Sequence, residues 1–372
     1  MEFLYENLLN LTWQHVVMWI IGGVLIYLAI KKDMEPTLLL PLGFGAIMVN
    51  LPFSGAVTQF IDGATEHGAL SILFNAGIDN ELFPLILFIG IGAMIDFRPV
   101  LSNPKLMIFG AAAQFGIFIT LCLASMFFDI NDAASIAIIG AADGPTSIVV
   151  ANKLNSNYLG AIMVAAYSYM ALVPIIQPPV IKLLTTKKER LIRMENNQKP
   201  VSKATLILFP IIVTIIAGLI APASVSLVGF LMFGNLIREC GVLNSLSETA
   251  QKSLANIVTI FLGISIASQM QAEQFLQPET LLILGLGLFA FIFDTAGGVL
   301  FAKFINLFSK NKVNPMIGAA GISAFPMSGR VVHKMGIKED PTNFLLMHSI
   351  GVNVFGQIAS VIAGGMILNF FM

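Results

Sequence analysis

Apolar runs of about 15 to 30 residues dominate the chain and are separated by short polar segments. About 20 apolar residues in a helix cross the hydrocarbon core of a bilayer, so runs of this length predict membrane spans. We therefore expect an all-α polytopic membrane protein. Its ten predicted spans cover about 11–30, 37–52, 82–97, 104–128, 157–181, 205–222, 224–238, 256–270, 279–307 and 343–370.

Two further apolar segments are too broken to form complete spans. Residues 133–154 and 314–331 are interrupted by glycine and proline, which break helices and leave backbone carbonyls without helical partners. Each segment must return to the side from which it entered if the next span is to run in the required direction. We predict two re-entrant hairpins, and an interfacial or re-entrant stretch between the second and third spans.

Positive charge gives the expected sidedness. Lysine and arginine gather at Lys31 and Lys32, at Arg98 and Lys105, and in the loop 182–203, and the positive-inside rule places all three regions in the cytoplasm. Both termini and the entry of the first hairpin are then outside, whereas the second hairpin enters from the cytoplasm. The acidic residues without basic neighbours belong outside: Glu2, Glu6, Asp62, Glu66, Asp79, Glu81, Asp129 and Asp132.

The chain contains a weak internal repeat. Four short patterns recur in the same order with offsets of roughly 173 to 186 residues. They divide the chain into 1–203, which includes the loop 182–203, and 204–372. Because each unit has about five spans, an odd number, the two units would be inverted, as in elevator-like secondary transporters. The matches pair Gly43, Phe44 and Asn50 with Gly229, Phe230 and Asn235; 89–92 with 262–265; 140–143 with 318–321; and 157–159 with 343–345.

Composition excludes several classes of function. The chain is 56% hydrophobic and 11% charged, against roughly 25% charge in soluble domains. A net charge of −1 without a basic stripe excludes a nucleic-acid partner. No motif for ATP hydrolysis or for a hydrolase occurs, and Cys122, Cys240 and the histidines lack the spacing of a transition-metal site. Acidic residues before the first span argue against a cleavable signal peptide.

Asp143 is the first candidate site residue. It lies between Gly140 and Pro145 in the first predicted hairpin, with the hydroxyl of Thr146 close by. A charge at membrane depth costs at least about 3 kcal/mol, so an acid there indicates a function. An acid, a broken backbone and a hydroxyl together predict a cation site. A buried acid that caps the hairpin turn is the alternative interpretation.

The second hairpin carries a complementary polar set. Asn314 and Ser323 offer oxygen ligands of the kind that hard cations prefer. Arg330 is suited to pair with a substrate carboxylate or with Asp143. The alternative is a polar interfacial loop whose arginine extends to the membrane surface. Asp294 is a second intramembrane acid, which indicates either a second ion site or a partner for a basic group. Asn353 and Gln357 lie on one face of the last span, where they line the same cavity or form hydrogen bonds between helices.

Residues 140–148, 169–179, 293–303 and 314–330 resemble the beta subunit of the biotin-dependent sodium-translocating decarboxylases. This family serves oxaloacetate, methylmalonyl-CoA and glutaconyl-CoA, and the resemblance extends over nearly the whole chain. It implies that Asp143 is the central sodium and proton-coupling carboxylate and that Tyr169 takes part in coupling. It also implies a functional set on the second hairpin: Asn314, Gly318, Ser323 and Arg330. Ser328 and Gly329 depart from the family, where we expect two alanines.

The resemblance further implies an activity and its partners. Carboxybiotin on a partner subunit would be decarboxylated here, which drives sodium export and consumes a proton. The partners would be a biotin carrier, a carboxyltransferase alpha subunit and a small single-span gamma or delta subunit, in a homo-oligomeric complex of the bacterial inner membrane. The start of the chain at its first span favours a CoA-thioester as the upstream substrate.

Two other functions fit the residues without the resemblance. A sodium-coupled secondary transporter of a small organic anion would also use two hairpins and inverted repeats. A purely structural membrane subunit is disfavoured, because Asp143 and Asp294 are two acids at membrane depth.

Overall fold

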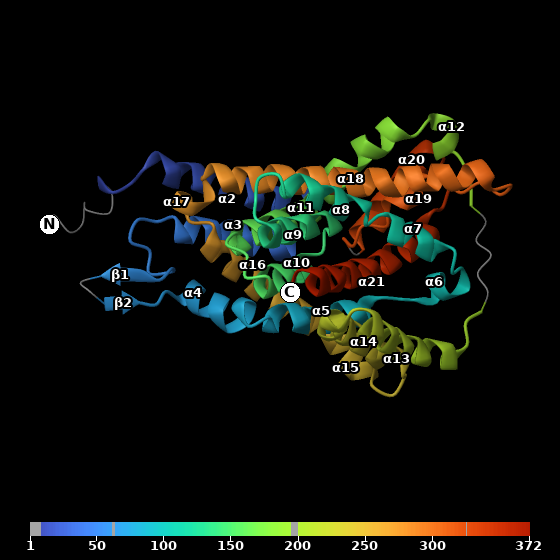
Figure 1. Ribbon diagram of the computed structural model, residues 1–372, viewed down its shortest axis with the longest axis horizontal. Helices are drawn as coiled ribbons and strands as arrows, with labels where there is room; N and C mark the ends of the chain where they lie inside the picture. Colours follow the sequence, from blue (N-terminus) through green and yellow to red (C-terminus); the bar gives the residue numbers. More distant parts are fainter. Residues whose placement is uncertain (1–8, 62–63, 195–199, 325) are drawn as a thin grey trace.

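The computed structural model describes residues 9–61, 64–194, 200–324 and 326–372. Glu2, Glu6, Asp62 and part of the loop 182–203 lie outside these ranges. Long helices dominate the described chain and run roughly along the long axis of the molecule (Figure 1). The prediction of an all-helical multi-pass protein is confirmed.

The helices of the first half follow the predicted spans within a few residues. Helix α2 begins where the Thr12 hydroxyl accepts a hydrogen bond from His15 N, and it ends with Lys31 and Lys32 at the negative end of the helix dipole. The helices are α2 (Trp13–Lys32), α3 (Pro36–Val49), α5 (Leu82–Met94), α7 (Leu106–Ala112), α8 (Phe115–Ala124) and α11 (Leu159–Leu184).

The second half contains five corresponding long helical stretches. The third of these begins about a dozen residues before the predicted span, because the polar α15 (Asn244–Thr249) and η4 (Ala250–Leu254) continue directly into α16 (Ala255–Ile266). The other helices are α13 (Lys203–Ile220), α14 (Val225–Glu239), α18 (Pro278–Phe308) and α21 (Leu346–Phe371).

Length and composition identify seven membrane-spanning helices among the described residues. An eighth is obtained if residues 69–79 and α5, which are bent by 63° at their junction, are taken as one span. Helices α3 and α14 have 14 and 15 residues and are shorter than a full span by this measure. The ten predicted spans therefore correspond to eight by length and two shorter helices.

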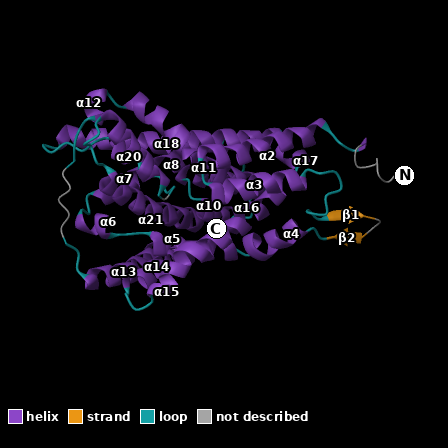
Figure 2. Ribbon diagram, turned by 180° about the vertical axis from the view of Figure 1, so that it is seen from behind, coloured by secondary structure: helices purple, strands orange, loops and turns teal. Residues whose placement is uncertain are grey.

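The stretch between α3 and α5 contains a small β-hairpin that the sequence analysis did not predict. Strands β1 (Gln59–Ile61) and β2 (Ala64–Glu66) pair antiparallel, with Gln59 opposite Glu66. Helix α4 (Ala69–Phe74) and a π-helical turn, η1 (Asn75–Asp79), follow. The β-hairpin lies at one end of the molecule, and α6 (Arg98–Ser102) and α12 (Lys187–Arg190) lie at the other (Figures 1 and 2).

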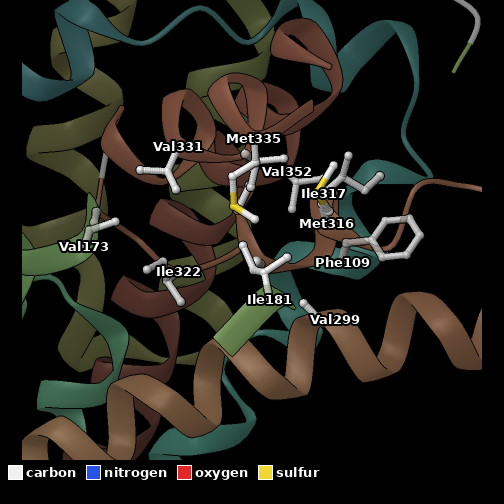
Figure 3. Close-up of a cluster of buried hydrophobic side chains, with 14 of the residues drawn as sticks. Phe109, Val173, Ile181, Val299, Met316, Ile317, Ile322, Val331, Met335 and Val352 are labelled. Atoms are coloured by element: carbon white, nitrogen blue, oxygen red, sulfur yellow. The ribbon is translucent and has the colours of Figure 1, made fainter. Parts of the chain in front are cut away.

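Two pairs of short helices fold back on themselves inside the molecule. The first, which we call hairpin 1, consists of α9 (Ile130–Ala137), η2 (Ile138–Ala141) and α10 (Gly144–Lys153). Hairpin 2 consists of α19 (Met316–Ala319) and α20 (Met327–Glu339), so it extends eight residues beyond the predicted end at 331. Hairpin 2 is packed in an apolar cluster that α7, α11, α18 and α21 contribute to (Figure 3).

The two halves pack against each other reciprocally. Helix α3 contacts α16, and α14 contacts α5. Helix α7 contacts α21, and α11 contacts α18; likewise α10 contacts α21, and α20 contacts α11. Each of these contacts between the halves thus has a counterpart in which the halves are exchanged.

Two asparagines, one in each half, form equivalent hydrogen bonds to the other half. Asn50 Nδ2 donates to Met270 O at 2.7 Å, just beyond the end of α16. Asn235 Nδ2 donates to Ile95 O at 2.9 Å, just beyond the end of α5. Each asparagine amide donates to a carbonyl just beyond the end of a helix in the other half, where the helix itself provides no donor. The pair occupies the positions that the sequence comparison matched.

We predict that Asn235→Leu lowers the thermal unfolding midpoint of the purified protein in detergent. The change leaves the Ile95 carbonyl buried without its donor, which costs about 1–3 kcal/mol. Asn311→Leu is the control, because Asn311 is exposed. Equal midpoints for the two variants would show that the Asn235 amide does not stabilise the fold.

Candidate functional site

The tips of the two hairpins are joined by a backbone hydrogen bond. Ser323 N, just after α19, donates to Ala141 O, at the end of η2, over 2.9 Å. Both residues are almost fully buried. Ala142, the next residue of hairpin 1, has φ +52°, which turns the chain sharply toward Asp143. The two broken segments therefore meet inside the protein, beside the acid.

Asp143 is the polar centre of this meeting point. It precedes the first turn of α10, and only 3% of its surface is exposed. Its Oδ2 accepts three hydrogen bonds, from Thr146 Oγ1 at 2.7 Å, Gln357 Nε2 at 2.7 Å and Ser360 Oγ at 2.9 Å. Donors of this kind and a helix N-terminus stabilise a carboxylate. Among the described residues, no ion pair joins Asp143 to Arg330 or to another cation.

Helix α21 contacts both tips from successive turns. Asn353 Nδ2 donates to Ile322 O at 2.7 Å, and Gly356 O accepts from Ser323 Oγ at 3.2 Å. Gln357, one turn after Asn353, reaches Asp143 instead. The structure thus brings together Asp143, Thr146, Ser323, Asn353 and Gln357, all of which were candidates from the sequence.

Asn314 and Gly318 lie on the entering limb of hairpin 2, before its tip. The Asn314 amide donates to Arg190 O and Ile192 O, both at 2.9 Å, and its Oδ1 accepts from Met316 N. Gly318 packs against α18, where a Cβ would lie 2.0 Å from Gly298 O. In this arrangement the two residues hold the hairpin limb in place.

The loop that Asn314 contacts is fastened to hairpin 2 by charges as well. We call residues 185–193 the linker strap, because they lead from the first half toward the second. Arg190 pairs with Glu339 at 2.7 Å, and Arg193 pairs with Asp340 at 2.7 Å. Hydrogen bonds from Thr342 and Arg193 lower the pKa of Asp340 to about 2. The strap is therefore tied to both ends of the hairpin.

Tyr169 belongs to α11 and contacts α18, and Asp294 belongs to α18 itself. The Tyr169 hydroxyl donates to Leu284 O. Asp294 Oδ1 accepts from Gly116 N, where α8 begins, while Oδ2 is buried without a hydrogen-bond partner among the described residues. A Cβ at Gly140 would lie 2.7 Å from that Oδ2. Asp294 is thus a second buried acid, in contact with hairpin 1 three residues before Asp143.

Arg330 faces a separate cavity of about 520 Å³. Its walls come from α11, α20 and the loop between α2 and α3. Burial raises the pKa of Glu35 in that loop, although Arg330 lies near enough to oppose the shift. The charged lining residues are Asp33, Glu35, Lys182, Arg330, Lys334, Lys338 and Glu339. The four cations outnumber the three acids, of which Glu339 is already paired with Arg190, so the cavity suits an anionic ligand.

Three residues of this region were not among the candidates predicted from the sequence: Ser360, Gln114 and Gln177. Ser360 lies three positions after Gln357, so helical spacing alone could have placed it on the same face. Gln114 and Gln177 are single amides in apolar runs, and both contact the backbone of hairpin 2. A glutamine in an apolar run could have marked each as a candidate, but the group that its amide contacts depends on how the helices pack.

A buried acid where two broken segments meet, in a multi-pass helical protein, is typical of ion-translocating membrane proteins. The sequence model of the Na+-transporting oxaloacetate decarboxylase beta subunit matches residues 14–371, so the chain belongs to this family.

Three relatives illustrate the range of the family. The methylmalonyl-CoA decarboxylase subunit beta of Veillonella parvula is 50% identical over 364 residues, covering 98% of this chain and 95% of its own. The glutaconyl-CoA decarboxylase subunit beta of Acidaminococcus fermentans is 48% identical over 358 residues, covering 96% and 93%. The oxaloacetate decarboxylase beta chain of Klebsiella pneumoniae is 43% identical over 419 residues, covering 98% and 96%.

The contact between α18 and hairpin 2 gives a prediction about stability. A Cβ at Gly298 would lie 2.1 Å from Gly318 O, and a backbone atom cannot move aside as a side chain would. We expect Gly298→Ala to lower the thermal midpoint in detergent. Gly285→Ala, in the same helix, meets nothing within 4 Å and should be neutral or stabilising by up to about 1 kcal/mol. Similar midpoints for both variants would contradict the close packing.

Proposed function

We propose that this beta subunit decarboxylates carboxybiotin carried by a partner subunit and couples the reaction to sodium export, with consumption of one proton. Membership of the family supports the sodium-transporting decarboxylase role. The observation that carries the coupling proposal is the burial of Asp143 where the two hairpin tips meet. An ion released from one face to the other must pass such a junction.

The proposed sodium ligands are oxygens around the tips. The three side-chain donors to Asp143 all reach Oδ2, so we assign Oδ1 to the cation. Asn353 Oδ1 is buried and has no hydrogen-bond partner within the described residues, so it offers a neutral oxygen one turn from Gln357. Ser323 adds a hydroxyl. Sodium and a proton would compete for the same carboxylate, and this competition links proton uptake to sodium release.

The other candidates receive supporting roles in this proposal. Asn314 and Gly318 position the entering limb of hairpin 2. Tyr169 links α11 to α18, and Asp294 provides a second acid beside hairpin 1. Gly318 and Tyr169 contact α18 and Asp294 belongs to it, so we infer that these three residues transmit changes at the site to α18, whereas Asn314 ties hairpin 2 to the strap.

We also infer that the two units, 1–203 and 204–372, are inverted repeats of an elevator-like transporter. The reciprocal asparagines Asn50 and Asn235 and the exchanged helix contacts support this relation. Helices α6 and α12, which contain the basic residues Arg98, Lys187, Lys188 and Arg190, lie at one end of the molecule (Figure 1). We assign that end to the cytoplasm by the positive-inside rule, and we propose that both termini are outside. The membrane would be the bacterial inner membrane.

The cavity at Arg330 is the proposed entry for the carboxylated cofactor. Lys182, Arg330 and Lys334 line it, and a carboxylate group of small size fits their charge. Decarboxylation releases carbon dioxide and leaves a nitrogen that takes up one proton. Arg330 and its neighbours would hold the anionic group and keep it at the cytoplasmic end.

The proposed partners are a biotin carrier, a carboxyltransferase alpha subunit and a small single-span gamma or delta subunit, in a complex with several copies of this chain. We propose an acyl-CoA as the upstream substrate, since the named methylmalonyl-CoA and glutaconyl-CoA relatives are 50% and 48% identical, and the oxaloacetate relative 43%. The alternative, a sodium-coupled transporter of a small organic anion, would use the same cavity without biotin.

We predict that Asp143→Asn abolishes sodium-stimulated decarboxylation while the complex still assembles. The amide keeps the size of the side chain but removes the charge that binds the cation. The measurement is decarboxylase rate against sodium concentration, with assembly checked by size-exclusion chromatography. Asp79→Asn is the control, because Asp79 is an exposed acid. Unchanged sodium dependence in Asp143→Asn would remove Asp143 from the site.

A second experiment separates the pump from the transporter. Inverted vesicles that contain the reconstituted complex should accumulate labelled sodium when the acyl-CoA substrate is added. Avidin captures biotin, so it should stop this uptake. Sodium uptake that proceeds equally with avidin would rule out carboxybiotin as the energy source and favour the transporter.

A further inference from the structure

Three carbonyls of hairpin 2, at the end of α19 and in the unwound segment that follows it, accept hydrogen bonds from side-chain amides. Carbonyls freed by a helix break at membrane depth need donors, and a bound cation is one way to satisfy them. Here Ala319 O accepts from Gln177 Nε2 at 2.7 Å, and Gly321 O accepts from Gln114 Nε2 at 3.3 Å. Ile322 O accepts from Asn353 Nδ2 at 2.7 Å. Side-chain amides therefore take the place of a cation at these three carbonyls.

The three amides come from three different parts of the fold. Gln114 lies between α7 and α8, Gln177 in α11 and Asn353 in α21. Their exposures are 5%, 0% and 0%. In each, the amide oxygen has no hydrogen-bond partner among the described residues. A buried unpaired oxygen is unfavourable, so an apolar side chain would suit the positions of Gln114 and Gln177 better unless their N–H donors are needed.

The segment that these amides hold leads directly to the site. Ser323 follows Ile322, and its backbone nitrogen makes the hydrogen bond to Ala141, two residues before Asp143. Gln177 also reaches Ser328 Oγ at 3.4 Å, in the first turn of α20. It therefore touches both limbs of hairpin 2. A shift of the segment would move the hairpin contact on which the geometry around Asp143 depends.

We propose that Gln114 and Gln177 are positioning residues that, with Asn353, form an amide clamp on residues 319–322. The clamp fixes the tip of hairpin 2 and so sets the affinity of the site at Asp143 for sodium. This inference rests on the proposed sodium site. The clamp acts through its N–H donors, and the Gln114 and Gln177 oxygens do not bind the cation.

The test uses paired substitutions in the full complex. Gln177→Met removes both amide atoms, whereas Gln177→Glu keeps an oxygen and, measured at a pH where the new carboxyl group is ionised, cannot donate to Ala319 O. Both should raise the half-saturating sodium concentration about tenfold, with the rate at saturating sodium within about twofold of the original. Gln114→Met should raise it less, about threefold, since its contacts are longer. Gln277→Met, at an exposed residue, is the control.

Several results would contradict the proposed amide clamp. An unchanged half-saturating concentration in Gln177→Met would mean that the amide has no influence on the site. Tighter sodium binding in Gln177→Glu would make the side-chain oxygen a ligand and end its assignment as a positioning residue. If Gln177→Met does not assemble, Gln114→Met decides the question by the same criterion.

A separate readout keeps this test independent of the decarboxylase reaction. Sodium that binds the folded subunit raises its thermal midpoint, whatever drives transport. The midpoint of each purified variant is therefore measured in sodium and in potassium. A sodium-specific shift that is weakened in Gln177→Met supports the clamp even if avidin-sensitive decarboxylation fails in the original complex. In that case only the carboxybiotin proposal is lost.

Discussion

The hydrogen bond from Ser323 N to Ala141 O is the interaction on which the rest of the site depends. It joins two segments that lie far apart in sequence and that both stop being helical where they meet. In a membrane such breaks are tolerated only where the freed groups find partners within the protein. The surrounding side chains meet this requirement: Thr146, Gln357 and Ser360 serve the carboxylate, and amides serve hairpin 2.

Helix α21 connects the two hairpins because its polar residues fall on one face. Asn353, Gly356, Gln357 and Ser360 are spaced by three, one and three positions, so their side chains and carbonyls reach adjacent points of the junction. Helix α11 contacts hairpin 2 in a comparable way through Gln177. Each hairpin is thus held by a helix of the other half, which makes the position of one tip depend on the other.

Much of this arrangement could be predicted from the sequence. Spans are long apolar runs, so their limits could be placed within a few residues, and glycine, proline and a lone acid marked hairpin 1. The small β-hairpin could not, because its three-residue strands have no apolar periodicity. The helix of the eighth span begins at Asn244, before its predicted start at 256, because polar residues form its exposed first turns. The partners of Asn314 and Tyr169 depend on which way each side chain points in the packed structure, and a single sequence does not contain that information.

The linker strap also affects how firmly the two halves of the protein are held together. Arg190, Arg193 and the carbonyls of Arg190 and Ile192 bind Glu339, Asp340, Asn314 and Asn343, all from the second half. The covalent joint is therefore backed by a docking contact that does not need the peptide chain to continue. A cut after the strap would therefore leave hairpin 2 joined to the first half by these contacts.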